Sequence, residues 1–185
     1  MIGQLPQSLD VNGKHYAIRS DFRDVLNILC AFSDPELEDK EKVYTCLFIL
    51  YEDFDSIPAD DYEAAFKAAL AFIDNGVKEE DKKSPRVMDW EQDANLLFPA
   101  INKVAGREVR SEEYIHWWTF IGYYMEISEG VYSTIISLRL KKAKGKKLEK
   151  WEHEFWNANK SACVLATKLT AEEQAAKDRL NALLG

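Results

Sequence analysis

The residues that could perform chemistry in this 185-residue chain are few, and their spacing matches no familiar catalytic motif. Neither His15, His116 nor His153 has another histidine or cysteine at a metal-binding spacing. Asp89 and Asp93 are four residues apart, so they would share one face of a helix and could chelate a cation together with His116. We favour another interpretation, in which Asp89 caps a helix and His116 donates a hydrogen bond at the edge of the core.

The cysteines give no sign of a redox or metal site. Cys30, Cys46 and Cys163 have no CxxC spacing, and each lies among apolar residues of a predicted helix. We therefore expect small buried thiols in a reducing cytosol. The chain also contains no GxSxG sequence, no phosphate-binding glycine loop and no dinucleotide fingerprint. We predict no catalytic residue, no cofactor and no metal, and we expect that the protein is not an enzyme.

Charge is distributed unevenly along the chain. The net charge of −8 argues against nucleic acid as the main ligand, because phosphate binding needs accumulated positive charge. Residues 34–93 contain 18 acidic and 7 basic residues, whereas residues 139–150 contain 7 basic and 1 acidic residue. This polarity favours head-to-tail contact between copies, so we expect a homo-oligomer whose charged contact uses Lys141, Lys142, Lys144, Lys146 and Lys147. A solvated linker and a nucleic-acid contact are the alternatives for this basic stretch.

The elements that must position these residues are mainly helical. We predict a mainly α fold, a single helical domain of about six to eight helices with a short N-terminal β-hairpin. Residues 1–19 alternate in polarity about Asn12-Gly13, which is typical of a hairpin turn. Residues 20–169 form the helical domain, with an exposed charged loop at 77–86. Residues 170–185 form a C-terminal helical tail, and no stretch of the chain predicts a signal peptide or a membrane span.

Several local signals predict where individual helices begin and end. Ser20 is the expected N-cap of the first helix. Asp89 and Gln92 have the spacing of a capping box that begins the fourth helix, and Pro99 should kink this helix or end it early. The fifth helix is expected to begin near Ser111. Two further signals are Gly106, placed to end the fourth helix, and a second capping box formed by Thr170 and Glu173. We also expect Asn75-Gly76 to close the third helix.

Aromatic residues are concentrated in the second half of the chain. All five tryptophans follow residue 89, and two are adjacent in the segment from His116 to Phe120. Apolar residues from Leu148 to Leu169 repeat at alternating intervals of three and four, which predicts one long packed helix. The candidate partner-binding residues are Trp117, Trp118, Phe120, Tyr124, Trp151 and Phe155. The alternative for each of the six is ordinary burial in the core.

Four segments resemble one protein family. They are FRDVLNILCAFSDPEL (22–37), MDWEQDANLLFPAIN (88–102), HWWTFIGYY (116–124) and the later IISLRLKKAKGKKLEKWEHEFW. They are similar to the bacteriophage "gp fifteen" family, which is encoded next to the tape measure gene in long-tailed phages of Gram-positive bacteria. The resemblance extends from the hairpin to about Asn159.

The resemblance implies a tail assembly chaperone that binds the tape measure protein and supports assembly of the tail tube. Such a protein would act in the cytoplasm of the infected or lysogenic bacterial host, would have no membrane partner and would be absent from the mature virion. A helical protein with a spare apolar stripe can cover the apolar seams of a long helical client. Two alternatives are a structural virion component, such as a tail or connector subunit, and a small nucleic-acid-binding regulator.

Overall fold

The computed structural model describes residues 3–75 and 85–184, and it is mainly helical with one N-terminal hairpin, as predicted. Its described part contains nine α-helices, one more than the six to eight expected. The elements, in chain order, are β1 (Ser8–Val11), β2 (Lys14–Ala17), α1 (Phe22–Phe32), α2 (Asp39–Leu50), α3 (Tyr62–Ile73), α4 (Ala94–Ala105), α5 (Trp117–Met125), α6 (Val131–Ala143), α7 (Lys150–Ala158), α8 (Lys160–Cys163) and α9 (Ala171–Leu184). None of the helices described here is long and apolar enough to cross a membrane.

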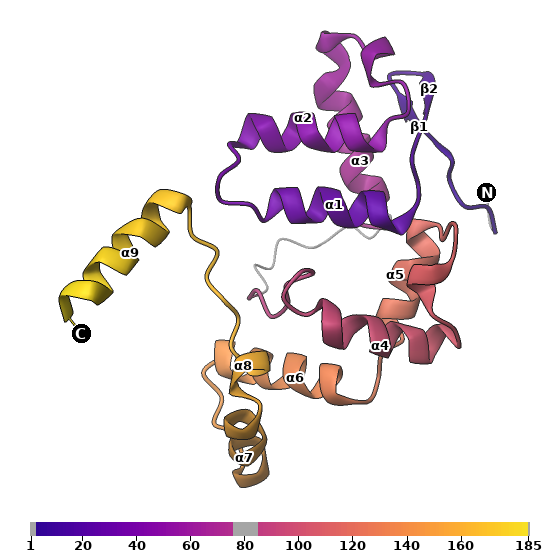
Figure 1. Cartoon of the computed structure of the whole chain (residues 1–185). Coiled ribbons are helices and arrows are strands. Elements are labelled where there is room, and N and C mark those ends of the chain that lie inside the picture. The colour runs from indigo at the N-terminus through magenta and orange to yellow at the C-terminus, as the bar shows by residue number, and fades with distance from the viewer. Residues whose placement is uncertain (1–2, 76–84, 185) are drawn as a thin grey trace.

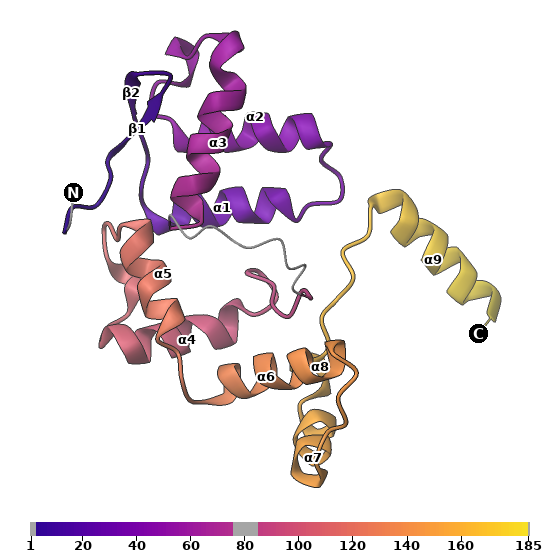
Figure 2. The same cartoon turned by 180° about the vertical axis from the view of Figure 1, so that it is seen from behind.

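The helices form an elongated arrangement (Figure 1). The hairpin and α1, α2 and α3 lie at one end, α4 and α5 are in the middle, and α6, α7 and α8 form the other end. The view from behind shows the same order and shows α9 standing apart from the rest of the chain (Figure 2). The two ends therefore present separate surfaces.

The hairpin has the predicted turn. Strands β1 and β2 are antiparallel, with Leu9 opposite Tyr16. Asn12 and Gly13 have φ values of 52° and 86°, the left-handed conformation that a tight two-residue turn requires. Val11 and Tyr16 are buried against the helices, so the ribbon gains the packing that an isolated hairpin lacks.

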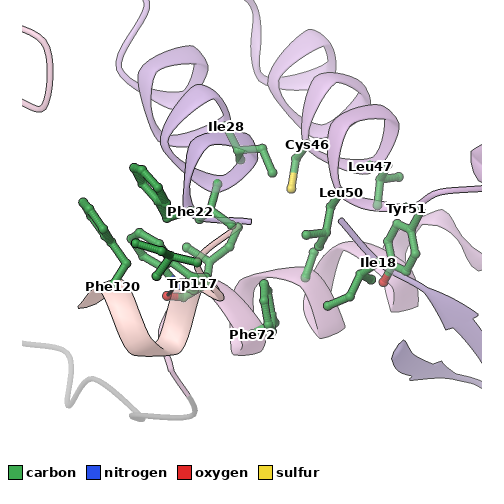
Figure 3. Packing of buried hydrophobic residues seen from close by; sticks show 14 of the residues in the cluster. Ile18, Phe22, Ile28, Cys46, Leu47, Leu50, Tyr51, Phe72, Trp117 and Phe120 are labelled. Atoms are coloured by element: carbon green, nitrogen blue, oxygen red, sulfur yellow. Dashed lines mark hydrogen bonds between the residues drawn. The ribbon is translucent and has the colours of Figure 1, made fainter. Parts of the chain in front are cut away.

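One continuous core joins the hairpin to α1–α5 and the start of α6. Its centre is aromatic: Phe22 of α1 stacks on Phe120 of α5 with ring centroids 4.3 Å apart, and Trp117 stacks on Phe120 at 6.0 Å (Figure 3). Phe72 of α3 lies close to this group, and its side chain is buried. Because these rings come from helices far apart in sequence, the core holds α1, α3 and α5 together.

The predicted starts of α1 and α5 are both wrong. Asp21, not Ser20, caps α1, because the Ser20 hydroxyl is paired with the Tyr114 hydroxyl 2.8 Å away. Helix α5 begins at Trp117 and not near Ser111, because the backbone N–H of Trp117 donates to the Ser20 carbonyl, which ties the preceding residues to α1. Both errors therefore come from tertiary hydrogen bonds to Ser20, which the local sequence does not reveal.

Helix α4 contains Pro99 and continues through it to Ala105, so the prediction that Pro99 ends this helix early is wrong. Leu97 and Ile101, on either side of the proline, are both fully buried, and this packing offsets the lost backbone donor. Gly106 ends the helix with φ 70°, as predicted.

The prediction of one long helix from Leu148 to Leu169 is wrong. Helix α7 ends at Ala158, Asn159 leaves the helical region at φ −119° and ψ 33°, and the short α8 is followed by non-helical chain from Val164 to Leu169. Side chains of other elements bind the backbone here, as described below, and this replaces helical hydrogen bonds. The predicted box of Thr170 and Glu173 is present at the start of α9.

Parts of two further predictions fall outside the described residues. The expected exposed loop at 77–86 includes residues 77–84, which the structure does not describe. Gly76, the predicted cap of the third helix, is also outside, whereas Asn75 before it has φ 55°. Asn75 thus supplies a left-handed residue just after α3.

Candidate protein-interaction surfaces

The start of α4 is held by a buried ion pair between Asp93 and Arg139. The two terminal nitrogens of Arg139 each donate to one carboxylate oxygen of Asp93 at 2.7 Å, and the side chains are 4% and 3% exposed. The other N–H groups of Arg139 donate to the carbonyl oxygens of Val87, Ala162 and Cys163. Because every donor of the buried cation is satisfied, this pair joins α6, α8 and the chain before α4 into one unit.

Asp89 organises the turn that leads into α4. Its carboxylate accepts hydrogen bonds from the backbone N–H groups of Glu91 and Gln92 at 3.0 and 2.8 Å. The Arg86 side chain donates to Asp89 at 2.5 Å, and Lys168 Nζ lies 3.4 Å away. Burial opposes ionisation of Asp89, but these hydrogen bonds and cations outweigh it and lower its pKa. The prediction that Asp89 caps the start of the fourth helix is wrong, because α4 starts at Ala94 with Asp93 as its N-cap, and Asp89 instead caps the turn at residues 90–93.

The capping box predicted for Asp89 and Gln92 is wrong. The backbone N–H of Asp89 donates to the carboxylate of Asp93 at 3.0 Å, not to Gln92. The Gln92 side chain instead donates to the Val164 carbonyl and accepts from the Ala166 N–H, at 2.8 and 2.9 Å. Gln92 therefore clamps the segment after α8, which is one reason why that segment is not helical.

His116 caps α5 with its own ring. Its Nδ1 accepts a hydrogen bond from the Trp118 N–H at 3.0 Å, which leaves Nε2 to donate to the Pro6 carbonyl at 2.9 Å. Both ring nitrogens are therefore used, and Asp89 and Asp93 are bonded to other groups. Within residues 3–75 and 85–184, no cluster of three or more histidine, cysteine or acidic side chains could hold a metal ion.

The tryptophan pair and Phe120 contribute to the core. Trp117 is 1% exposed and Phe120 is fully buried, so neither has surface to offer a partner in this fold. The Trp117 indole donates to the Ile73 carbonyl at 2.8 Å. Trp118 is half-buried, donates to the Phe72 carbonyl at 2.9 Å and stacks on the Phe72 ring. Both indoles thus tie α5 to the end of α3.

An apolar groove lies between α5 and α6. Met125 and Val131, on either side of the turn between these helices, are 64% and 53% exposed. Tyr124 is half-buried and its hydroxyl donates to the Met88 sulfur. The groove encloses about 360 Å³ and is lined by Tyr124, Met125, Ile127, Tyr132, Ser133, Ile136, Ser137 and Leu140. Its size, apolar lining and helical walls suit the apolar face of a partner helix.

Two of the five candidate lysines are used inside the protein. Lys141 pairs with Glu152, whose side chain is 3% exposed, and this hydrogen bond lowers the pKa of Glu152. Lys142 Nζ lies 4.1 Å from the centre of the Trp156 ring, a cation–π contact. Lys141 and Lys142 therefore dock α7 on α6 through their side chains.

The other lysines form an exposed turn. Gly145, at φ 67°, reverses the chain after α6, and the Lys146 N–H donates back to the Lys141 carbonyl at 2.9 Å. Lys144, Lys146 and Lys147 are exposed and form no ion pair with any residue that the structure describes. We call residues 144–150 the basic turn.

Trp151 follows the basic turn directly and is 54% exposed, whereas Phe155 of the same helix is half-buried. The Trp151 indole donates to the exposed side chain of Glu149, within the basic turn, at 3.1 Å. Of the six candidate aromatic residues, Trp151 is the most open to a partner.

A second exposed aromatic group lies on α2, and sequence reasoning missed it. Tyr44 and Phe48 are 54% and 58% exposed and stack on each other with ring centroids 6.2 Å apart. Phe54 packs edge-on against both rings, and Tyr62 stacks on Phe54. We call these four residues the aromatic patch. One sequence signal could have revealed the aromatic patch. Tyr44 and Phe48 are four residues apart, so they share one face of α2, and this face differs from the one that the apolar residues predict to be buried.

The described residues form a mainly helical protein with an apolar groove between α5 and α6, exposed aromatic residues on α2 and buried ion pairs that join its elements. The chain belongs to the family described as Bacteriophage Gp15 protein, whose model matches residues 1–165. This confirms the family resemblance of the sequence; residues 166–185, which include α9, lie outside the match. Comparison with curated proteins and with solved structures gave no match.

Proposed function

We propose that this protein is a tail assembly chaperone, which binds the tape measure protein and supports assembly of the tail tube without catalysing a reaction. Family membership supports a role in a bacteriophage. The observation that carries the finer proposal is the apolar groove between α5 and α6, with Met125 and Val131 exposed beside it. The protein acts in the cytoplasm of the infected or lysogenic host and is absent from the mature virion.

The physical argument concerns the client. A tape measure protein is long and helical, and its apolar seams would aggregate before the tube encloses them. A groove of about 360 Å³ covers only part of such a seam, so each contact is of moderate strength. Many copies bound along one client protect it collectively, and each can still dissociate when the tube arrives. Moderate binding therefore fits a protein that leaves the finished particle.

Co-expression with the tape measure protein of the same phage tests the proposal. The wild-type chain should raise the soluble yield of the client and elute with it. The variant Met125→Glu/Val131→Glu places two charges at the groove and should lose both effects. The matched control Val104→Glu changes an apolar residue that is 37% exposed on α4, outside the groove, and should behave as wild type.

Two results would contradict the chaperone role. One is a client whose solubility and elution do not change when the wild-type chain is present. The other is recovery of this protein at fixed stoichiometry in purified virions, which would instead indicate a structural tail or connector component. Mass spectrometry of purified particles measures this directly.

One observation favours a second candidate, a nucleic-acid-binding regulator. Trp151 is exposed and directly follows the basic turn in the sequence, so a base could stack on its ring. The net charge of −8 opposes this function. A salt-sensitive shift of labelled DNA that disappears in Lys146→Glu/Lys147→Glu would support the regulator, and no shift at low salt would exclude it.

A further inference from the structure

The aromatic patch on α2 is built to receive an apolar group. Beside it is a hollow of about 360 Å³, lined by Asp39, Lys40, Val43, Tyr44 and Tyr62. Tyr44 and Phe48 each expose more than half of their surface, although both are held in place by the buried ring of Phe54. Rings that are both exposed and already ordered lose little conformational freedom when a partner binds them.

The surroundings of the aromatic patch are strongly acidic. Residues 34–63 contain 11 acidic and 2 basic residues. Glu63 pairs with Lys67, and the other acidic residues of this range form no ion pair within the described part of the chain. The patch is therefore an apolar surface inside a negative field, and it favours a partner that presents an apolar side chain beside cations.

The basic turn and Trp151 have this complementary chemistry. Lys144, Lys146, Lys147 and Lys150 are exposed and without ion pairs among described residues, and Trp151 follows them with more than half of its surface open. The turn is held at both ends, because the Gly145 and Lys146 N–H groups donate back to the end of α6 and the Lys141–Glu152 ion pair holds α7 on α6. The tryptophan and its flanking cations are thus presented as one unit.

The two surfaces lie at opposite ends of the molecule, at α2 and at α7, in both views (Figures 1 and 2). A single copy therefore does not bring them together. We propose that the aromatic patch of one copy binds Trp151 and the basic turn of a second copy. The contact is heterologous, so one copy keeps its basic turn free, the other keeps its aromatic patch free, and further copies can extend the assembly at both ends. The contact leaves the α5–α6 groove free and is independent of the proposed function.

Sedimentation of the purified full-length chain, without client, tests this interface. At about 50 mM salt the wild-type chain should associate as its concentration rises, and about 500 mM salt should weaken the association because exposed charges are screened. Phe48→Lys and Trp151→Ala should each weaken it at least about tenfold, as expected for aromatic anchors. Tyr44→Lys disrupts the same patch independently if Phe48→Lys is poorly folded. Lys103→Glu and Val104→Lys, on the exposed surface of α4, are the matched controls.

A mixing experiment decides whether the contact is head to tail. Phe48→Lys retains its basic turn, and Trp151→Ala retains its aromatic patch. The mixture should therefore form heterodimers that grow no further, although each variant alone is monomeric. The proposal is overturned if the wild-type chain is monomeric at all concentrations at low salt, if the patch variants associate as wild type does, or if the mixture stays monomeric. Loss of DNA binding in Trp151→Ala without any self-association would assign this surface to nucleic acid.

Discussion

Arg139 of α6 reaches across to Asp93 at the start of α4 and forms two hydrogen bonds of 2.7 Å with its carboxylate. The same guanidinium binds three backbone carbonyl groups, two of them in or near α8. The Arg139 side chain therefore connects α6 both to the start of α4 and to α8. The acidic start of α4, one of the segments that carry the family resemblance, therefore has a structural role in joining α4 to α6 and α8.

Removing one partner of this ion pair should strongly destabilise the fold. Arg139→Ala leaves Asp93 as a buried unpaired charge and leaves three carbonyl groups without a donor, so we expect a loss of about 3–5 kcal/mol in the free energy of unfolding. Urea denaturation measures it. Arg110→Ala removes an exposed pair with Glu108 and a cation–π contact with Phe98, and it should lower the free energy of unfolding far less than Arg139→Ala does. Equal effects of the two substitutions would contradict the structural role of Arg139.

Trp117 and Trp151 should differ sharply in their effect on stability. Trp117 is 1% exposed, so Trp117→Ala creates a cavity and should cost about 3–5 kcal/mol. Trp151 is 54% exposed, so Trp151→Ala should change the free energy of unfolding by no more than about 0.5 kcal/mol. Thermal and urea unfolding of both variants provide the comparison. An unfolded Trp151→Ala would show that this ring closes a core, as the sequence alone also allowed.

Stability should fall on acidification. The pKa values of Asp89 and Glu152 are lowered in the folded protein from usual values of 3.8 and 4.5. The unfolded chain therefore binds more protons in this range, so the stabilisation is complete above about pH 5 and is lost as pH falls through the folded pKa values. Urea midpoints between pH 7 and pH 3 should show this loss. Asp89→Asn/Glu152→Gln should have a flatter profile, whereas the exposed control Glu154→Gln should retain the wild-type slope.

Thiol labelling should separate local from global opening. Burial raises the pKa of Cys46 to about 12 and also raises the pKa of Cys163, and both thiols are fully buried. In a Cys30→Ser background, we expect Cys46 to react only through global unfolding. Arg139 binds the Cys163 carbonyl, so Arg139→Ala should accelerate labelling of Cys163 more than that of Cys46. Equal acceleration at both sites would show that α8 does not open by itself.

Several elements followed from short-range signals in the sequence. The Asn12-Gly13 turn, the helix end at Gly106 and the capping box of Thr170 and Glu173 all lie where they were predicted. Each depends on residues within three positions of one another, whose backbone preferences act in any context. The mainly helical class followed in the same way from apolar periodicity.

Two of the predictions that failed involve hydrogen-bond partners far away in sequence. The start of α5 depends on hydrogen bonds to Ser20, and the break after Ala158 accompanies bonds from Arg139 and Gln92 to the following backbone. The periodic spacing from Leu148 to Leu169 is compatible with a helix, but it does not show that the side chains of Arg139 and Gln92 donate hydrogen bonds to this part of the backbone. Periodicity also cannot show which apolar residues the rest of the chain leaves uncovered, and for this reason the pair Tyr44 and Phe48 was missed.

The sequence by itself determined the helical class, the hairpin, the phage family and the separation of acidic and basic segments, because these properties are local or additive along the chain. Only the tertiary structure decided that Trp117 and Phe120 are buried, that Trp151 is open and that Lys141 and Lys142 are used internally. Exposure is a property of the packed whole, since a side chain reaches a partner only where no other element of its own chain covers it.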